Sequence, residues 1–260
     1  GSRDTFEMLY NNNIFLEQKA FSVGARIEHL RENIDKSQHG DFYNHKSLGS
    51  APYKLSTHLE NGRGVYTFCM CPGGEVVPAA SEENMVCTNG MSEFARDKTN
   101  SNSALLVSIN PQDFNNNHPL AGIEFQRKIE KSAYEAGGRD YSAPIILLSD
   151  FFDGKLKTEP GEVVPTYMGG TGVKLASPYD YLPEIVCDGI KNAIIDFDKK
   201  IHGFAKGTSV LTGAETRTSA PIRILRNSET GLGLGFENLY PAGEGAGYAG
   251  GITSAAIDGV

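Results

Sequence analysis

Residues 53–70, YKLSTHLENGRGVYTFCM, contain the turn that decides the fold class. Two β-type runs, residues 53–60 and 64–70, flank the tripeptide Asn61-Gly62-Arg63. An Asn-Gly pair between two such runs is a strong hairpin signal, because both residues tolerate the positive φ angles of a tight turn. The stretch therefore predicts two adjacent antiparallel strands.

Neighbouring segments extend this pattern along the chain. Further strands are expected at residues 20–29, 75–79, 85–88 and 103–109, with 85–88 pairing with 75–79. Helices are expected at residues 3–10, 31–38, 120–135, 143–152 and 182–200, and short strands near Val210 and Ile222. Strands dominate early and helices later, without repeating strand–helix–strand units. This order predicts an α+β fold, with an antiparallel, β-rich domain and a helical segment.

The bulk composition excludes several classes of protein. The chain has 260 residues, of which 39% are hydrophobic and 22% charged, as in an ordinary globular protein. Its net charge of -8 argues against general nucleic-acid binding, because no basic excess exists to neutralise phosphates. No apolar stretch approaches the ~20 residues that span a bilayer. Four cysteines in a chain of this length do not form a disulfide framework, so a cytoplasmic protein with reduced thiols is expected.

Cys69 and Cys71 are candidates for thiol chemistry. They lie two residues apart on an expected strand, so both side chains should point to the same face. Three roles are open: redox-active thiols, metal ligands together with Cys87, or small buried side chains beside Pro72-Gly73-Gly74. The third is favoured, because such a pair closes a disulfide poorly and no second C-x-x-C or H-x-x-x-H spacing supports a metal site.

Arg217 is the candidate for substrate recognition. It lies among small hydroxyl residues in the segment 215–219, ETRTS. Its guanidinium could hold a substrate carboxylate in a bidentate grip, or pair with Glu215. Arg26 is expected to form an ion pair with Glu28 and His29 on a strand face, and His29 is a candidate proton donor. Two further arginines are expected to be surface charges: Arg223 and Arg226.

Residues 239–251, LYPAGEGAGYAGG, are the strongest chemical signal in the sequence. A short strand at Leu239-Tyr240, a glycine turn and a helix from Ile252 would present backbone N–H groups to an anionic or polar ligand. Three of its glycines also satisfy G-x-G-x-x-G, namely Gly245, Gly247 and Gly250. A dinucleotide fingerprint requires a second strand and a later acidic residue, and neither follows here. A glycine-rich loop with only backbone duties is the alternative.

This segment resembles the C-terminal flavin motif of a family of bacterial FAD-dependent dehydrogenases, which are largely uncharacterised. The resemblance runs from Leu239 through Asp258-Gly259. Other segments resemble the family in the same order along the chain: SVGARIEH at 22–29, YTFCMCPGGEV at 66–76, residues 89–92 with 96–97, residues 100–104, and residues 215–219 with Pro221. Several long motifs in one order are far more specific than one glycine pattern.

The resemblance implies a longer parent protein. In that family a G-x-G-x-x-G segment and an Ala-Thr-Gly strand precede the Arg-Asp-Thr with which this chain opens. Both ends are therefore interpreted as cuts, with Gly1-Ser2 as a cloning remnant and the termini as remnants of a FAD/NAD(P)-binding Rossmann-like domain. Residues 1–19 would end an upstream flavin-domain segment, 20–230 would form an inserted substrate-side α+β domain, and 231–260 would form a C-terminal flavin-contacting segment.

The resemblance also implies cofactor-binding residues. It places Gly243 and Glu244 near the ribityl or phosphate part of FAD, and Gly250, Gly251 and Ile252 beside the flavin ring. A helix N-terminus there would stabilise the negative charge of reduced flavin, and glycines would let the backbone approach the ring. For Glu244 the alternative is a carboxylate that merely caps the helix.

We therefore expect the parent protein to be a FAD-dependent oxidoreductase that passes a hydride or an electron pair through flavin, to or from an unidentified small molecule. NAD(P)H is a candidate electron donor. The isolated chain is expected to retain neither tight FAD binding nor activity, and to need the rest of its own flavin domain. The weak catalytic candidates are Arg217 and Cys71, and no metal is expected. Two alternatives stay open: a non-catalytic binding or assembly module, and a thiol- or metal-dependent enzyme built on Cys69, Cys71 and Cys87.

Overall fold

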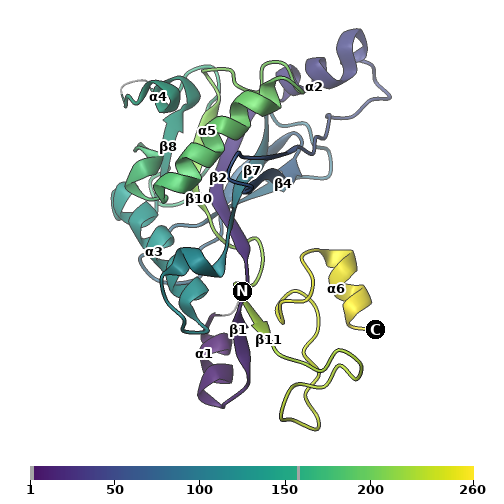
Figure 1. Cartoon of the computed structure of the whole chain (residues 1–260). Helices are drawn as coiled ribbons and strands as arrows, with labels where there is room; N and C mark the ends of the chain where they lie inside the picture. The colour runs from purple at the N-terminus through teal and green to yellow at the C-terminus, as the bar shows by residue number, and fades with distance from the viewer. Residues whose placement is uncertain (1–2, 157–158) are drawn as a thin grey trace. The chain divides into compact units, whose positions relative to one another are not determined.

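The computed structural model describes residues 3–156 and 159–260 (Figure 1). The chain divides into two compact units. Unit 1 comprises Gly1–Ser22, Ser108–Lys128 and Arg217–Val260, and unit 2 comprises Val23–Val107 and Ile129–Thr216. Gly1-Ser2, interpreted above as a cloning remnant, lies outside the described residues. Both units are therefore assembled from segments that are far apart in the sequence.

Unit 2 is built on a seven-stranded sheet in the order β3-β4-β7-β2-β10-β8-β9 (Figure 1). Its strands are β2 (Phe21–Leu30), β3 (Ser56–His58), β4 (Gly64–Cys71), β7 (Asn100–Ile109), β8 (Ala143–Leu147), β9 (Val173–Leu175) and β10 (Val210–Glu215). The pairs β3–β4, β4–β7, β2–β10 and β10–β8 are antiparallel, and β8–β9 is parallel. A separate antiparallel pair is formed by β5 (Gly74–Pro78) and β6 (Thr88–Ser92).

The helices lie between and after these strands, which confirms the α+β fold. They are α2 (Arg31–His39), α3 (Ala121–Ala136), α4 (Leu148–Asp153) and α5 (Glu184–Asp198). Helix α5 lies along the sheet and contacts β3 and β4 (Figure 1). Its buried side chains recur at helical spacing, because only one face of the helix meets the sheet: Val186, Ile190, Ala193, Ile194 and Phe197.

The central strands β2 and β7 are buried along almost their whole length. The two backbones pack so closely at Gly24 of β2 that a Cβ there would lie 1.8 Å from the carbonyl oxygen of Leu105 on β7. Several polar side chains are nevertheless buried here, including Arg26, Glu28 and Asn102. Such groups are tolerated inside a protein only when they are hydrogen-bonded, so these strands must contain an internal polar network.

Three predictions of secondary structure are wrong. Residues 143–152, predicted as one helix, form strand β8 followed by helix α4, because the β-branched Ile145 and Ile146 are buried in the sheet between its neighbours β10 and β9. The strand that pairs with β5 begins at Thr88, so only the last residue of the predicted strand 85–88 belongs to it. Leu239-Tyr240 lies in a loop, where the Leu239 carbonyl accepts from the Gly233 N–H.

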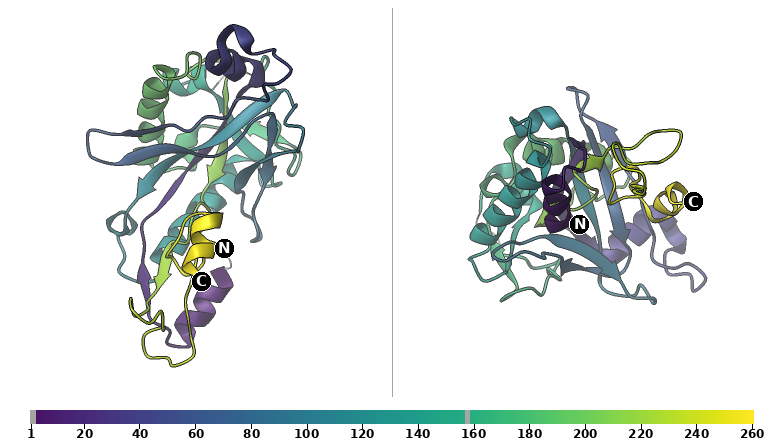
Figure 2. Two further views of the ribbon diagram at one scale, coloured as in Figure 1. Left: turned by 90° about the vertical axis from the view of Figure 1, so that its right-hand side faces the viewer. Right: turned by 90° about the horizontal axis from the view of Figure 1, so that it is seen from below.

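Unit 1 is smaller and contains α1 (Arg3–Asn11), β1 (Leu16–Gln18), β11 (Ile222–Ile224), α6 (Ile252–Asp258) and the first part of α3. Strands β1 and β11 pair antiparallel. The core of this unit joins all three of its chain segments: Phe6, Leu120, Ile123, Ala220 and Ile222. Beyond β11 the chain forms long loops before α6 (Figure 2). The Rossmann-like remnant at the termini stays a prediction.

No helix within residues 3–156 and 159–260 is both long enough and apolar enough to cross a membrane.

Candidate functional site

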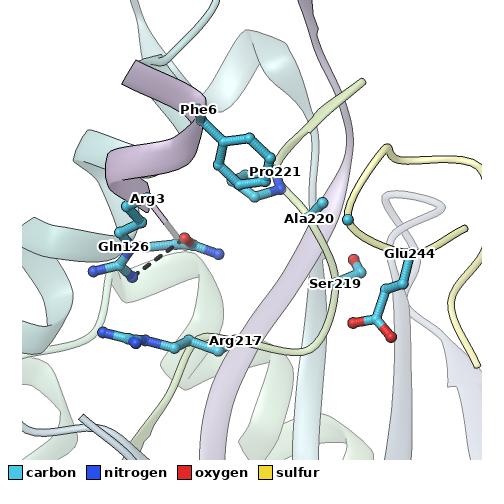
Figure 3. A pocket seen from close by; sticks show the side chains of 9 residues that line it. Arg3, Phe6, Gln126, Arg217, Ser219, Ala220, Pro221 and Glu244 are labelled. Atoms are coloured by element: carbon cyan, nitrogen blue, oxygen red, sulfur yellow. Dashed lines mark hydrogen bonds between the residues drawn. The ribbon is translucent and has the colours of Figure 1, made fainter. Parts of the chain in front are cut away.

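A small pocket in unit 1 draws on all three chain segments of that unit (Figure 3). Its cavity has a volume of about 60 Å³. The lining residues are Arg3, Phe6, Gln126, Arg217, Ser219, Ala220, Pro221, Glu244 and Gly245. Arg217 and Glu244 were singled out from separate sequence motifs, so the fold brings a predicted substrate-binding residue and a predicted cofactor-binding residue to one place.

One side of the pocket is formed by Arg3, Arg217 and the neutral Gln126, and Figure 3 shows Ser219 and Glu244 across from them. Arg3 is the first residue of α1 and is only 5% exposed. Its Nη2 donates to Oε1 of Gln126 at 3.2 Å, and Gln126 is itself buried on α3. The carbonyl of a buried amide therefore orients the Arg3 guanidinium, whose planar fork suits an anion.

The apolar wall of the pocket is rigid. Phe6 and Ala220 belong to the hydrophobic core of unit 1, and Pro221 lies against α3. A Cβ at Gly122 of α3 would lie 2.8 Å from the Pro221 side chain. Because helix and loop pack this tightly, the backbone that presents Arg217 and Ser219 has little freedom to move.

The glycine-rich segment is held in place by Arg226. The Arg226 guanidinium binds both carboxylate oxygens of Asp258, at 2.6 and 2.9 Å, and donates to the Pro241 carbonyl at 2.7 Å. It also stacks on the Tyr248 ring, 3.7 Å from its centroid. Asp258 in turn accepts from the Gly243 N–H at 2.8 Å, and these two contacts lower the pKa of its carboxyl. The prediction that Arg226 is merely a surface charge is wrong.

The glycines of this segment serve different purposes. Gly243 and Gly247 have φ angles of 75° and 87°, and a Cβ at Gly247 would lie 2.4 Å from the Ile222 carbonyl oxygen. The fold itself therefore requires glycine at these two positions. At Gly245 and Gly250 a Cβ would meet nothing within 4 Å. The backbone at these two positions is open to a ligand, as a flavin-contacting segment requires.

The residues predicted to contact flavin also fall into two groups, one accessible and one buried. Glu244 lines the pocket, whereas Gly243 is buried under the Asp258 carboxylate. Gly250 and Ile252 are exposed, Gly251 is partly exposed, and the three residues lie at the start of α6. The first N–H groups of a helix have no acceptor within the helix, so this backbone fits a polar ligand such as a flavin. The backbone at Gly250, Gly251 and Ile252 is therefore accessible from solvent, and the assignment of these residues and Glu244 to FAD stays a prediction.

Arg26 is the centre of the polar network in unit 2. The buried guanidinium donates to both carboxylate oxygens of Glu215 at 2.6 and 2.7 Å, and to Oδ1 of Asn102 at 2.8 Å. The prediction that Arg26 pairs with Glu28 and His29 is therefore wrong.

Glu28 and His29 have other partners. The Glu28 carboxylate accepts from Oγ1 of Thr166 at 2.7 Å and from Nδ2 of Asn100 at 3.0 Å, and burial raises its pKa. His29 Nε2 donates to the Phe204 carbonyl at 2.9 Å. Burial lowers the pKa of His29 to about 4, so its ring is neutral at pH 7. A buried neutral ring is poorly suited to the role of proton donor.

The two cysteines of strand β4 point different ways. The ladder with β7 is interrupted between Phe68 and Cys71, and Cys69 has a φ of 42°. This irregularity leaves Cys69 exposed and Cys71 buried, so the prediction of one shared face is wrong. Burial raises the pKa of the Cys71 thiol even though Arg26 opposes the shift. Among the described residues, no three His, Cys, Asp or Glu side chains gather as potential metal ligands.

Comparison with known sequences identifies the family. A family model described as FAD-dependent protein, C-terminal domain-like, matches residues 20–218. The chain belongs to this family. A protein of similar sequence is an uncharacterized protein of Clostridium beijerinckii, which is 50% identical over 260 residues, or 100% of the chain. The chain spans only 48% of the length of that relative.

The sequence alone pointed to some of the residues that line the pocket of unit 1 and missed others. It pointed to Arg217 and Glu244, but Arg3, Gln126 and Ser219 were not singled out as site residues. Gln126 had a usable signal, because it lies three residues after Ile123 and three before Ile129, on the apolar stripe of an expected helix. A polar residue on such a stripe needs a buried partner. Arg3 offered no comparable signal, since the first turn of a surface helix commonly contains charges.

Proposed function

We propose that this chain is the substrate-side part of a FAD-dependent oxidoreductase, together with a closing segment that contacts the flavin. A hydride or an electron pair would pass between the flavin and a small molecule, with NAD(P)H as the candidate electron donor. Membership of the FAD-dependent family supports the flavin, and the additional length of the relative supports a further flavin-binding part in the parent protein. The observation that carries the proposal is the pocket that Arg217 and Glu244 both line.

The residues proposed to contact FAD are Glu244, Gly250, Gly251 and Ile252, and the buried Gly243 is proposed to support them. When bound, FAD supplies the two-electron chemistry, and the protein supplies orientation and electrostatics. The hydrogen bond from the Gly243 N–H to Asp258 holds the start of the glycine-rich segment in place. The glycine backbone near α6 leaves room for a flat ring. Arg217 is proposed to bind and orient the substrate rather than to transfer protons, since an arginine stays protonated.

Exposed apolar side chains on α6 support a need for the remainder of the flavin domain. Ile252 is 94% exposed and Ile257 is 71% exposed, although both are large apolar side chains. They are five residues apart and therefore point to different sides of this short helix, so α6 offers apolar side chains on more than one side to a covering part of the intact protein. We therefore propose that the isolated chain lacks tight FAD binding and activity, and that both return when the chain is joined to its upstream segment.

The visible absorption spectrum of the full-length protein tests this proposal. Purified protein that includes the natural upstream segment should show the two visible bands of oxidised flavin, and added NADH or NADPH should bleach them. A colourless full-length protein would contradict the proposed function and favour a non-catalytic binding module.

A matched pair of glycine variants tests the placement of the flavin. In the full-length protein, Gly250→Val adds a side chain where the chain itself has no atom within 4 Å of a Cβ, so the variant should fold normally but lose bound flavin. Gly161→Val is the control, because Gly161 is also exposed and equally open. If both variants retain flavin equally, the flavin does not lie against Gly250.

A further inference from the structure

We infer that a groove in unit 2 binds an aromatic carboxylate, that is, a flat ring that carries one carboxylate group. The groove is lined by the end of β4, by β6 and by the turn at residues 93–96, all of which belong to unit 2. Its lining includes Met70, Cys71, Met91, Phe94 and Arg96. The inference goes beyond the proposed function, because it concerns a different set of residues and does not depend on flavin.

The size of the groove suits a small organic molecule. Its volume is about 690 Å³, and sites for small molecules have volumes of about 300–1,000 Å³. The pocket of unit 1, at about 60 Å³, has room for only a few water-sized groups. The groove of unit 2 can therefore hold an acid with one or two rings, together with water.

The turn at residues 93–96 has a fixed backbone. The Arg96 N–H donates to the Glu93 carbonyl at 3.1 Å, and the Arg96 carbonyl accepts from Oγ of Ser50. The turn also packs directly on the loop after β4, because a Cβ at Gly73 would lie 1.9 Å from the Arg96 carbonyl oxygen. A fixed backbone thus presents the exposed side chains of Phe94 and Arg96, so little backbone freedom is lost when a ligand binds.

Exposed apolar side chains in the groove favour an aromatic ring. Phe94 is fully exposed and Met91 is 65% exposed, and both line the groove. Exposed apolar patches commonly mark binding sites, because a ligand that covers them removes apolar surface from water. Thioethers and phenyl rings pack favourably against aromatic rings, and Met70 adds a second thioether. A flat ring in the groove would cover these side chains.

The charge of the ligand follows from Arg96. Among residues 3–156 and 159–260, its guanidinium makes no hydrogen bond or ion pair. Glu93 also lines the groove, but Lys98 binds its carboxylate at 3.1 Å. A guanidinium presents parallel N–H bonds that match the two oxygens of a carboxylate. The Glu93 carboxylate disfavours a second negative charge nearby, so a carboxylate is favoured over a phosphate dianion.

Titration of the 260-residue chain with isotope-labelled methionine methyl groups, followed by nuclear magnetic resonance, tests the groove without any flavin. The chain has five methionines. Met70 and Met91 line the groove, whereas Met8, Met85 and Met168 do not and serve as internal controls. Sodium benzoate should shift the Met70 and Met91 signals in a saturable way and leave the other three unchanged.

Two analogues of benzoate separate charge from shape. Benzamide keeps the flat ring but has no charge, and it should bind about tenfold more weakly because charge-assisted hydrogen bonds are lost. Cyclohexanecarboxylate keeps the charge but has no aromatic ring, and it should also bind more weakly. Benzoate should therefore bind most tightly of the three.

A pair of arginine variants tests the cation. Arg96 is exposed, so Arg96→Gln should fold normally, weaken benzoate binding about tenfold and leave benzamide binding unchanged. The matched control is Arg139→Gln. Arg139 is also an exposed arginine of unit 2 with a positive φ, 63° against 51° for Arg96, and it does not line the groove. Phe94→Ser should weaken the binding of both ligands, and thermal melts check that each variant is folded.

Any of five results would overturn the inference. Benzoate could leave the Met70 and Met91 signals unchanged, benzamide could bind as tightly as benzoate, or Arg96→Gln could bind benzoate like the wild type. NAD⁺ could bind more tightly than benzoate, which would assign the groove to a dinucleotide. A groove that responds in the 260-residue chain but not in the full-length protein would be an interface with the rest of the parent protein. The flavin spectrum of the full-length protein is independent of these titrations, so failure of this inference and failure of the proposed function can be told apart.

Discussion

Removal of the Glu215 carboxylate should strongly destabilise unit 2. The Arg26 side chain is 0% exposed and that of Glu215 is 6% exposed, so solvent screens the pair very little. Glu215→Gln leaves the guanidinium buried beside a neutral amide. Breaking a buried ion pair by removing one partner costs about 3–5 kcal/mol. For a body of this size each kcal/mol lowers Tm by about 2–4 °C, so Tm should fall by about 6–20 °C.

Urea and thermal unfolding, followed by circular dichroism, measure this loss. Glu17→Gln is the control, since the exposed Glu17 lies 3.3 Å from Arg223, and exposed pairs contribute about 0–1 kcal/mol. The double variant Arg26→Met, Glu215→Leu should recover part of the loss, because two apolar side chains replace two buried charges. A Glu215→Gln protein within about 1 kcal/mol of the wild type would refute the reasoning, and would mean that water reaches Arg26.

Three further predictions concern other parts of the chain. His29 has a folded pKa of about 4 against 6.5 for an ordinary histidine, so the unfolded chain binds protons more readily. The free energy of unfolding should therefore fall as pH drops from about 6.5 towards 4. Urea unfolding of His29→Gln, repeated over this pH range, should show a weaker dependence of that free energy on pH. Asp258→Asn should accelerate amide exchange at Gly243, since the charged anchor shared with Arg226 is lost; unchanged exchange would show that the anchor is dispensable. Gly24→Ala should cost about 3 kcal/mol in urea unfolding because its Cβ would collide with a backbone oxygen, and a cost near zero would mean that β2 and β7 can separate.

Local signals predicted most of the elements correctly. The Asn61-Gly62 turn predicted the β3–β4 hairpin, and Gly62 indeed has a φ of 77°. Helical periodicity predicted α5 to within two residues at each end. The failure at 143–152 has a physical cause, because a continuous apolar run fits either a buried strand or a buried helix, and the neighbouring strands decide.

Long-range pairings could not be predicted in this way. Arg26 and Glu215 are 189 residues apart, and they meet because of the register between β2 and β10. The nearer Glu28 was the natural candidate from the sequence, but it is held by Thr166 instead. The pocket has the same character: motifs pointed to Arg217 and Glu244, while the contact of Arg3 with Gln126 depends on how α1 packs on α3.

Unit 1 is built from three separate chain segments, and this constrains the order in which parts of the protein can fold during synthesis. Phe6 and Ile222 belong to one hydrophobic cluster but are separated by most of the polypeptide. During synthesis, α1 leaves the ribosome long before β11 exists. Its apolar face therefore stays unpacked while the strands of unit 2 are translated. Closure of such long loops is slow and leaves apolar surface exposed in the meantime. Nascent chains that stall before residue 217 would therefore present an unpaired α1 to chaperones and proteases, and the pocket of unit 1 would be among the last features to form.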